Sequence, residues 1–102
     1  MLFRSRFVPI ERSDLVKARL RKVVLEDAVA VEHRWKSLHK ATFMGNVMEA
    51  KVYIYLQGEK DQVYRVNTTL WACTSEWVVF KESVRVPVEC VMGVEFYHSS
   101  EE

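Results

Sequence analysis

Hydrophobic residues occupy both faces of the strands predicted in the C-terminal half of the chain. In a half-buried antiparallel sheet, apolar and polar residues alternate because only one face packs on a core. Here the segment 52–56 alternates Val, Ile and Leu with two tyrosines, and the segment 77–80 does not alternate at all. The pattern therefore predicts that something covers the second face: a second copy, a partner, a ligand or closure of the sheet itself.

The same half of the chain predicts an antiparallel meander. Its strands are expected at 49–57, 63–73, 77–81 and 84–88, with a last extended piece near 91–97. Odd-length loops between them keep one set of residues on one face, and pair Ile54 with Val66, and Ala72 with Val78. The face predicted to receive a helix comprises Val52, Ile54, Leu56, Tyr64, Val66, Leu70, Ala72, Val78, Phe80, Val84 and Val86.

The first 40 residues predict a short strand followed by a long amphipathic helix. The strand, 2–8, stops at Pro9, which lacks a backbone N–H and favours a sheet edge or a turn. Ser13 is the expected N-cap of the helix. Apolar residues then recur at steps of three and four, as in one face of a helix. They are Val16, Leu20, Val24, Ala28, Val31, Trp35 and Leu38.

The length of this helix raises a difficulty. Residues 13–40 would span about 42 Å as a continuous helix, longer than a domain of this size is wide. We therefore expect the helix to bend, to break near 26–27, or to protrude and pack on another copy. The segment 29–35 also fits a strand of period two, and Gly45 with Asn46 favours a helix end.

Together these elements predict a single α+β domain over residues 1–102. It comprises a short N-terminal strand and one long or broken amphipathic helix packed on a four- to five-stranded antiparallel meander. The segments 77–81 and 84–88, followed by Val91, Val94 and Phe96, resemble small Sm- or SH3-type barrels, in which a strand bends before the closing strand. This resemblance implies an alternative fold, a small Sm/SH3-like barrel with an N-terminal helix.

Composition and charge narrow the class of protein. The apolar fraction of 49% and the charged fraction of 28% are ordinary for a globular domain. The net charge of +1 conceals a charge of +5 over residues 1–40 and −4 over residues 41–102. Cys73 and Cys90 are too few for a disulfide scaffold, and no apolar run is long enough to span a bilayer. We expect a cytoplasmic protein with no membrane partner.

The sequence offers no catalytic, metal or cofactor motif on which a site can be built. His33 and His39 are six residues apart and point to different sides of a helix. The carboxylates at 59–61 lie at a loop tip, which does not shift a pKa as a cleft does. We therefore expect no cofactor and favour a non-enzymatic role. A ligand-binding or enzymatic pocket between helix and sheet remains an alternative.

Two binding surfaces are predicted instead. The first is an aromatic second face of the sheet, which would join two copies across a two-fold axis or bind a protein partner; its residues are Tyr53, Tyr55, Arg65, Trp71, Trp77 and Val79. The second is a nucleic-acid surface, in which exposed aromatic rings stack on bases and basic residues contact phosphates. Its cations are Arg4, Arg6, Arg12, Arg19, Arg34, Lys36 and Lys40.

Overall fold

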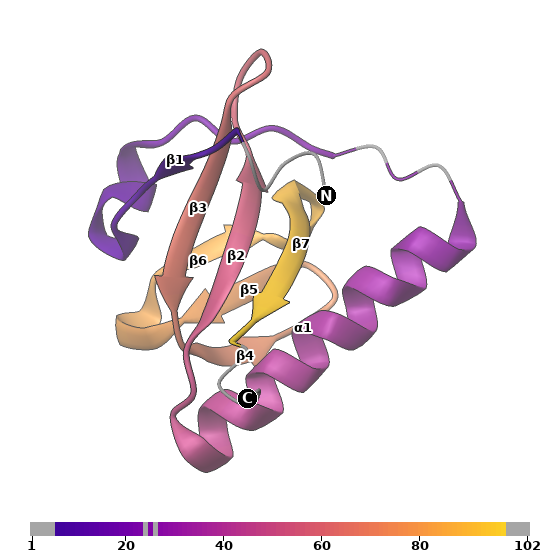
Figure 1. The fold of residues 1–102 in the computed structure, drawn as a ribbon, viewed down its shortest axis with the longest axis vertical. Helices are drawn as coiled ribbons and strands as arrows, with labels where there is room; N and C mark the ends of the chain where they lie inside the picture. Colours follow the sequence, from indigo (N-terminus) through magenta and orange to yellow (C-terminus); the bar gives the residue numbers. More distant parts are fainter. Residues whose placement is uncertain (1–5, 24, 26, 98–102) are drawn as a thin grey trace.

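The computed structural model describes residues 6–23, 25 and 27–97, and within them the expected α+β class is confirmed (Figure 1). One α-helix, α1 (Ala28–Met48), lies against two β-sheets. The strands are β1 (Val8–Pro9), β2 (Val52–Gln57), β3 (Val63–Thr68), β4 (Leu70–Cys73), β5 (Trp77–Phe80), β6 (Arg85–Pro87) and β7 (Val91–Phe96). Short 3₁₀ helices are η2 (Arg12–Lys17), η3 (Lys81–Ser83) and η4 (Val88–Cys90).

The strands form two sheets rather than the single meander that the sequence predicts. One sheet has the order β1-β3-β2-β7 and the other β4-β5-β6, and only β1 with β3 is a parallel pair. The expected strand 63–73 is divided at Thr69, whose carbonyl oxygen accepts a hydrogen bond from the Lys81 amide. Because the chain changes sheet there, the inward faces of both sheets pack on one core.

Most of the predicted strand register is confirmed. Ile54 pairs with Val66, and Leu70 pairs with Phe80. A shift of register after Leu70 places Ala72 opposite Val79 instead of Val78. Eight of the eleven residues of the predicted inward face are fully buried, whereas Tyr64, Ala72 and Val84 are half-buried, and the buried Val91 was not part of that prediction. The eight are Val52, Ile54, Leu56, Val66, Leu70, Val78, Phe80 and Val86.

The N-terminal region differs from the prediction of one helix over 13–40. Residues 12–17 form η2, which is preceded by Glu11 as N-cap, so Ser13 does not cap a helix. Helix α1 begins only at Ala28, where the side chain of Asp27 accepts a hydrogen bond from the Ala30 amide at 2.7 Å. The break expected near 26–27 therefore corresponds to the N-terminal end of α1. The segment 29–35, for which a strand was the alternative prediction, is helical.

The far end of α1 also lies beyond its predicted position. The helix continues through Gly45 and Asn46 to Met48 and ends at Glu49, which has a left-handed φ of 54°. Gly45 faces inward, and a Cβ built there would lie 2.2 Å from the carbonyl oxygen of Leu70. Glycine at this position therefore permits close approach of helix and strand rather than ending the helix.

Helix α1 buries only Leu38 among the residues of the predicted stripe that lie within it. Its buried residues are Leu38, Ala41 and Gly45, and it contacts β4 and β7. Val31 and Trp35, which the predicted stripe directs to the core, are 44% and 56% exposed. A helix this close to a strand accommodates small residues best, so Ala41 and Gly45 decide which side is buried.

At the other edge of the first sheet, β1 runs beside β3. The edge position predicted for Pro9 is confirmed, because β1 is the outermost strand and pairs with β3 alone. The amide of Ile10 then donates to the carbonyl of Arg65 at 2.9 Å. The expected strand residues 2–5 lie outside the described residues. The N-terminal segment thus covers part of the face that the sequence left uncovered.

Candidate interaction surface

The outer face of the first sheet carries a stack of aromatic rings around one arginine. The guanidinium of Arg65 lies 4.1 Å from the ring centroid of Phe7 and 4.0 Å from that of Tyr53. Tyr53 in turn stacks on Tyr97, with centroids 5.3 Å apart. Guanidinium groups are attracted to the negative faces of such rings. Both faces of Arg65 are therefore engaged by rings of its own chain.

Tyr55 lies in the same sheet but is buried. Only 1% of the residue is exposed, and the ring of Phe7 packs edge-on against it with centroids 5.9 Å apart. Its hydroxyl donates to Oε1 of Glu95 at 2.6 Å. Sequence reasoning placed Tyr55 on an open binding face, but the N-terminal segment covers it.

The hydroxyl of Tyr55 predicts how stability responds to alkaline pH. Burial raises its pKa above the ordinary value of 10.0, with a further contribution from Glu95 that Arg65 opposes. Folding thus favours the protonated form, so this stability is complete below the unfolded pKa and is lost as the pH rises through about 10 towards the folded pKa. We expect urea unfolding to show an alkaline loss of stability that is smaller in Tyr55→Phe. The control is Tyr97→Phe, which removes an exposed hydroxyl; equal alkaline slopes for wild type and Tyr55→Phe would contradict the prediction.

The remaining predicted interface residues lie on the second sheet. Trp71 is in β4, and Trp77 and Val79 are in β5. The guanidinium of Arg85 lies 4.1 Å from the centroid of the Trp77 ring, whereas Trp71 is 44% exposed. Since the chain changes sheet at Thr69, the six predicted residues do not form the single face that the sequence suggested.

The cations predicted to contact nucleic acid are dispersed, and most have partners within the chain. Arg6 is exposed, and Arg4 lies outside the described residues. Ion pairs between exposed side chains are weak individually. Each carboxylate partner nevertheless reduces the positive electrostatic field that these cations would offer to a phosphate backbone. The partners are Glu82 for Arg12 (2.9 Å), Glu59 for Arg19 (3.6 Å), Glu32 for Lys36 (3.3 Å), the Val91 carbonyl for Arg34 (3.4 Å) and the Phe96 ring for Lys40 (4.6 Å to its centroid).

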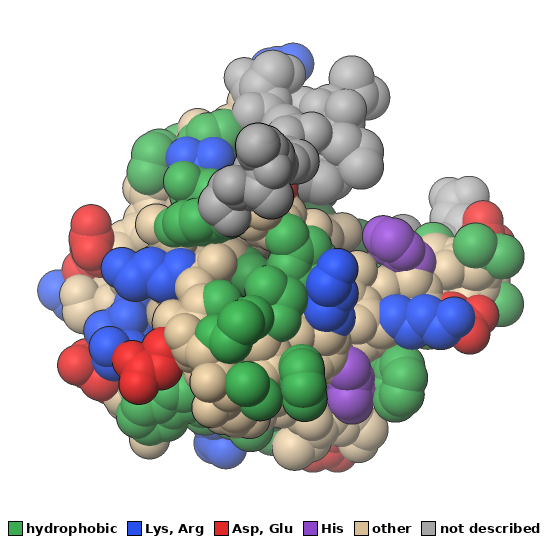
Figure 2. All heavy atoms as spheres, turned by 60° about the horizontal axis from the view of Figure 1, so that its bottom comes forward, with side chains coloured by type: hydrophobic (Ala, Val, Ile, Leu, Met, Phe, Trp, Pro, Cys, Tyr) green, Lys and Arg blue, Asp and Glu red, His purple; other side chains and the backbone are tan. Residues whose placement is uncertain are grey.

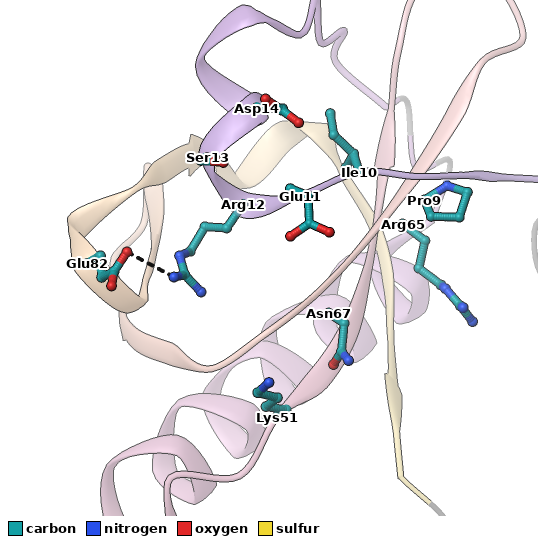
Figure 3. A pocket seen from close by; sticks show the side chains of 10 residues that line it. All are labelled: Pro9, Ile10, Glu11, Arg12, Ser13, Asp14, Lys51, Arg65, Asn67 and Glu82. Carbon is teal, nitrogen blue, oxygen red and sulfur yellow. Dashed lines mark hydrogen bonds and ion pairs between the residues drawn. The ribbon is translucent and has the colours of Figure 1, made fainter.

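A hollow of about 700 Å³ lies beside the aromatic stack (Figure 3). Figure 3 shows Arg12 reaching across one side of it to Glu82, 2.9 Å away. Three cationic and three acidic side chains line it, so the charges balance and neither sign of ligand is favoured. This hollow does not lie between the helix and a sheet, where the sequence predicts a ligand pocket as an alternative. Its lining residues are Pro9, Ile10, Glu11, Arg12, Ser13, Asp14, Lys51, Arg65, Asn67 and Glu82.

The two cysteines do not have the environment of reactive thiols. Cys90 is buried and Cys73 is half-buried, and neither forms a disulfide. Burial raises the pKa of both thiols, which disfavours the nucleophilic thiolate. Among the described residues, no three His, Cys, Asp or Glu side chains are grouped so that they could hold a metal ion.

Six of the ten large hydrophobic residues that are exposed in the described part of the chain lie on α1. Five residues spaced by four form a row, here called the helix ridge: Val31, Trp35, His39, Phe43 and Val47. Trp35 is 56% exposed, Phe43 66% and Val47 62%. The ring of His39 packs on that of Trp35 with centroids 3.9 Å apart. In Figure 2, which looks from the side of α1, hydrophobic and histidine side chains are exposed together over the helix.

Sequence reasoning missed this surface because it assigned Val31 and Trp35 to the core. The ridge itself was visible as apolar residues at a spacing of four. The signal that could have separated it from the core was the group of small residues at Ala41 and Gly45, which suits close packing. Phe43 and Val47 continue the ridge beyond residue 40, where the helix had been expected to end.

No protein-family model matches the chain, and neither the curated proteins nor the solved structures compared with it contain a match. Among the described residues, no helix combines the length and the apolar character that crossing a membrane requires. The function is therefore inferred from the surfaces described above.

Proposed function

We propose that this protein is a non-enzymatic interaction module that binds another protein through the helix ridge. The observation that carries the proposal is the exposure of Trp35 and Phe43 on one side of α1, four residues before and after His39. Contiguous apolar patches of this kind mark interaction sites, and aromatic residues, Trp above all, supply much of the binding energy at such sites.

The fold supports this assignment because it does not need the ridge for its own core. The crossing from β3 to β4 and the 3₁₀ turn η4 before β7 favour a small Sm/SH3-like barrel against which α1 packs. Leu38, Ala41 and Gly45 already anchor the helix against β4 and β7. The apolar side chains of the ridge are additional to the core, and their exposure to water is unfavourable unless a partner covers them.

The other candidate surfaces support binding less well. On the sheets, the rings of Tyr53 and Trp77 are in contact with Arg65 and Arg85 of the same chain, and Trp71 is the one predicted ring that is largely exposed. The predicted nucleic-acid cations are dispersed over several elements, and three of the seven, Arg12, Arg19 and Lys36, are paired with carboxylates. The balanced hollow favours no charged substrate.

A photo-crosslinking experiment in the cells that naturally express this protein tests the proposal. Phe43 is replaced by benzoylphenylalanine, and illumination is expected to yield discrete covalent adducts with a protein. The matched control carries the same probe at Asp61, an exposed residue in the turn between β2 and β3, away from α1 (Figure 1). Adducts from Phe43 that are absent from Asp61 support the proposal. Equal labelling from both positions, or none from Phe43, would overturn it.

A further inference from the structure

We infer that the occupant of the helix ridge is a second copy of this chain, with the two α1 helices antiparallel across a two-fold axis beside His39. This inference rests on the proposed function and names its partner. The sequence of the ridge is symmetric about His39. Trp35 and Phe43 lie four residues on either side of it, and two valines, Val31 and Val47, lie eight residues on either side.

This symmetry is what a two-fold interface requires. Across such an axis, if residue i of one copy contacts residue j of the other, residue j also contacts residue i. With His39 at the axis, Trp35 of each copy faces Phe43 of the other. Val31 and Val47 lie about 160° apart around the helix, at about 100° per residue, so they flank the contact without meeting across it. Aromatic meets aromatic at the centre.

The spacing of the ridge also fits a known geometry of helix packing. Residues spaced by four form ridges inclined to the helix axis, and two such ridges interdigitate when the helices cross at about −50°. The helix ridge has this spacing throughout its length. Because each step of four residues turns about 40° around the helix, Trp35, His39 and Phe43 share one side and form the contact, whereas Val31 and Val47 point away from it.

The area available is close to what a specific dimer needs. Aromatic side chains carry about 150–250 Å² each, so Trp35 and Phe43 together expose on the order of 250 Å² at 56% and 66% exposure. With the exposed side chains of Glu32 and Lys36 on the same side of the helix, this surface offers on the order of 500 Å² per copy, or about 1,000 Å² for the pair, which is the lower bound of a specific interface.

Pairing the ridges does not bury an unpaired charge. No Lys, Arg, Asp or Glu belongs to the ridge. Of its charged neighbours, Lys36 is 3.3 Å from Glu32 on the same helix, and Lys40 extends over the ring of Phe96. A buried charge without a partner would oppose association. A substitution that places a charge in the ridge is therefore expected to weaken the dimer strongly.

The first experiment measures the mass of the purified protein by light scattering from low micromolar to millimolar concentration. Wild type is expected to form dimers, and Phe43→Glu is expected to raise the dimer dissociation constant by about 100-fold. The matched control is Val16→Glu, which places the same charge at a valine of η2 that is 77% exposed and should leave the dimer intact. Circular dichroism establishes that each variant is folded.

A second experiment tests the antiparallel register. Trp35→Lys and Phe43→Glu should each weaken the dimer when alone, because each homodimer places charges against an aromatic ring. When the two variants are mixed, the introduced lysine of one chain faces the introduced glutamate of the other, and Phe43 still faces Trp35. The mixture should therefore associate at least about 10-fold more tightly than either variant. A mixture no tighter than its components would overturn the antiparallel arrangement.

The outcomes separate this inference from the proposed function. A wild-type protein that stays monomeric, while the probe at Phe43 still captures another protein, overturns the self-association and leaves the interaction role. A dimer that survives Phe43→Glu places the two-fold axis elsewhere and also overturns the inference. If, in addition, the probe at Phe43 captures nothing, the proposed function fails with it.

Discussion

Replacing Gly45 by alanine is expected to lower the free energy of unfolding by about 2–4 kcal/mol. The added Cβ would lie 2.2 Å from the backbone oxygen of Leu70 and 3.0 Å from Cγ2 of Thr69. A backbone oxygen in a paired strand cannot move aside as a flexible side chain can, so α1 must shift away from β4. Alanine has a higher helix propensity than glycine by about 1 kcal/mol. The expected net loss of stability means that the cost of the clash is larger than this gain.

Thermal and urea unfolding at one fixed protein concentration would measure the effect of Gly45→Ala. The expected loss corresponds to a melting temperature lower by about 10–25 °C for a domain of this size. Asn46→Ala is the matched control because it changes the next, exposed residue of the same helix, where better propensity should stabilise slightly. A Gly45→Ala protein as stable as wild type would show that the helix does not approach β4 this closely.

Leu38→Ala is the second substitution expected to have a large effect, about 2–5 kcal/mol of lost stability. Leu38 is fully buried and is the one large apolar side chain by which the described part of α1 enters the core. Truncation removes its contacts and leaves a cavity between helix and sheets, which the strands can fill only by distorting their pairing.

The control for Leu38→Ala is Val29→Ala on the same helix. Val29 is 76% exposed and lies outside the helix ridge, so its truncation should change stability by less than about 0.5 kcal/mol. Chemical denaturation of both variants decides which side of α1 faces the core. Similar losses from the two variants would contradict the observed burial of Leu38.

The register of this protein's strands could be predicted well from its sequence, because the two-residue period of a strand and the loop lengths fix which residues share a face, even where apolar and polar residues do not alternate. The pairing of Ile54 with Val66 follows from this parity together with the odd loop length. The alternation of side chains between the two faces of a strand does not determine which strands share a sheet. The crossing at Thr69 depends on how the two sheets close around a common core, which is a property of the whole chain.

The helix was harder to predict because hydrophobicity alone does not identify its buried side. Trp35 contributes more to an apolar stripe than Gly45 does, yet Gly45 is buried and Trp35 is exposed. Close approach to a strand selects for small side chains, whereas a binding surface selects for large ones. The predicted aromatic face failed for a related reason: the chain's own Phe7 covers Tyr55, and no local pattern shows which distant segment will do so.

The pairing of β2 with β7 has a consequence for the order of folding. Val52 pairs with Phe96, so the first sheet is completed only when segments some forty residues apart have met, and the entropy of closing that loop must be overcome first. Proteins rich in such distant pairings fold in milliseconds to seconds rather than microseconds. Until β7 is in place, the buried side of α1 lacks one of its two sheet contacts. Before β7 pairs, the chain therefore exposes part of the buried side of this helix together with the helix ridge, and it is most prone to aggregate during that interval.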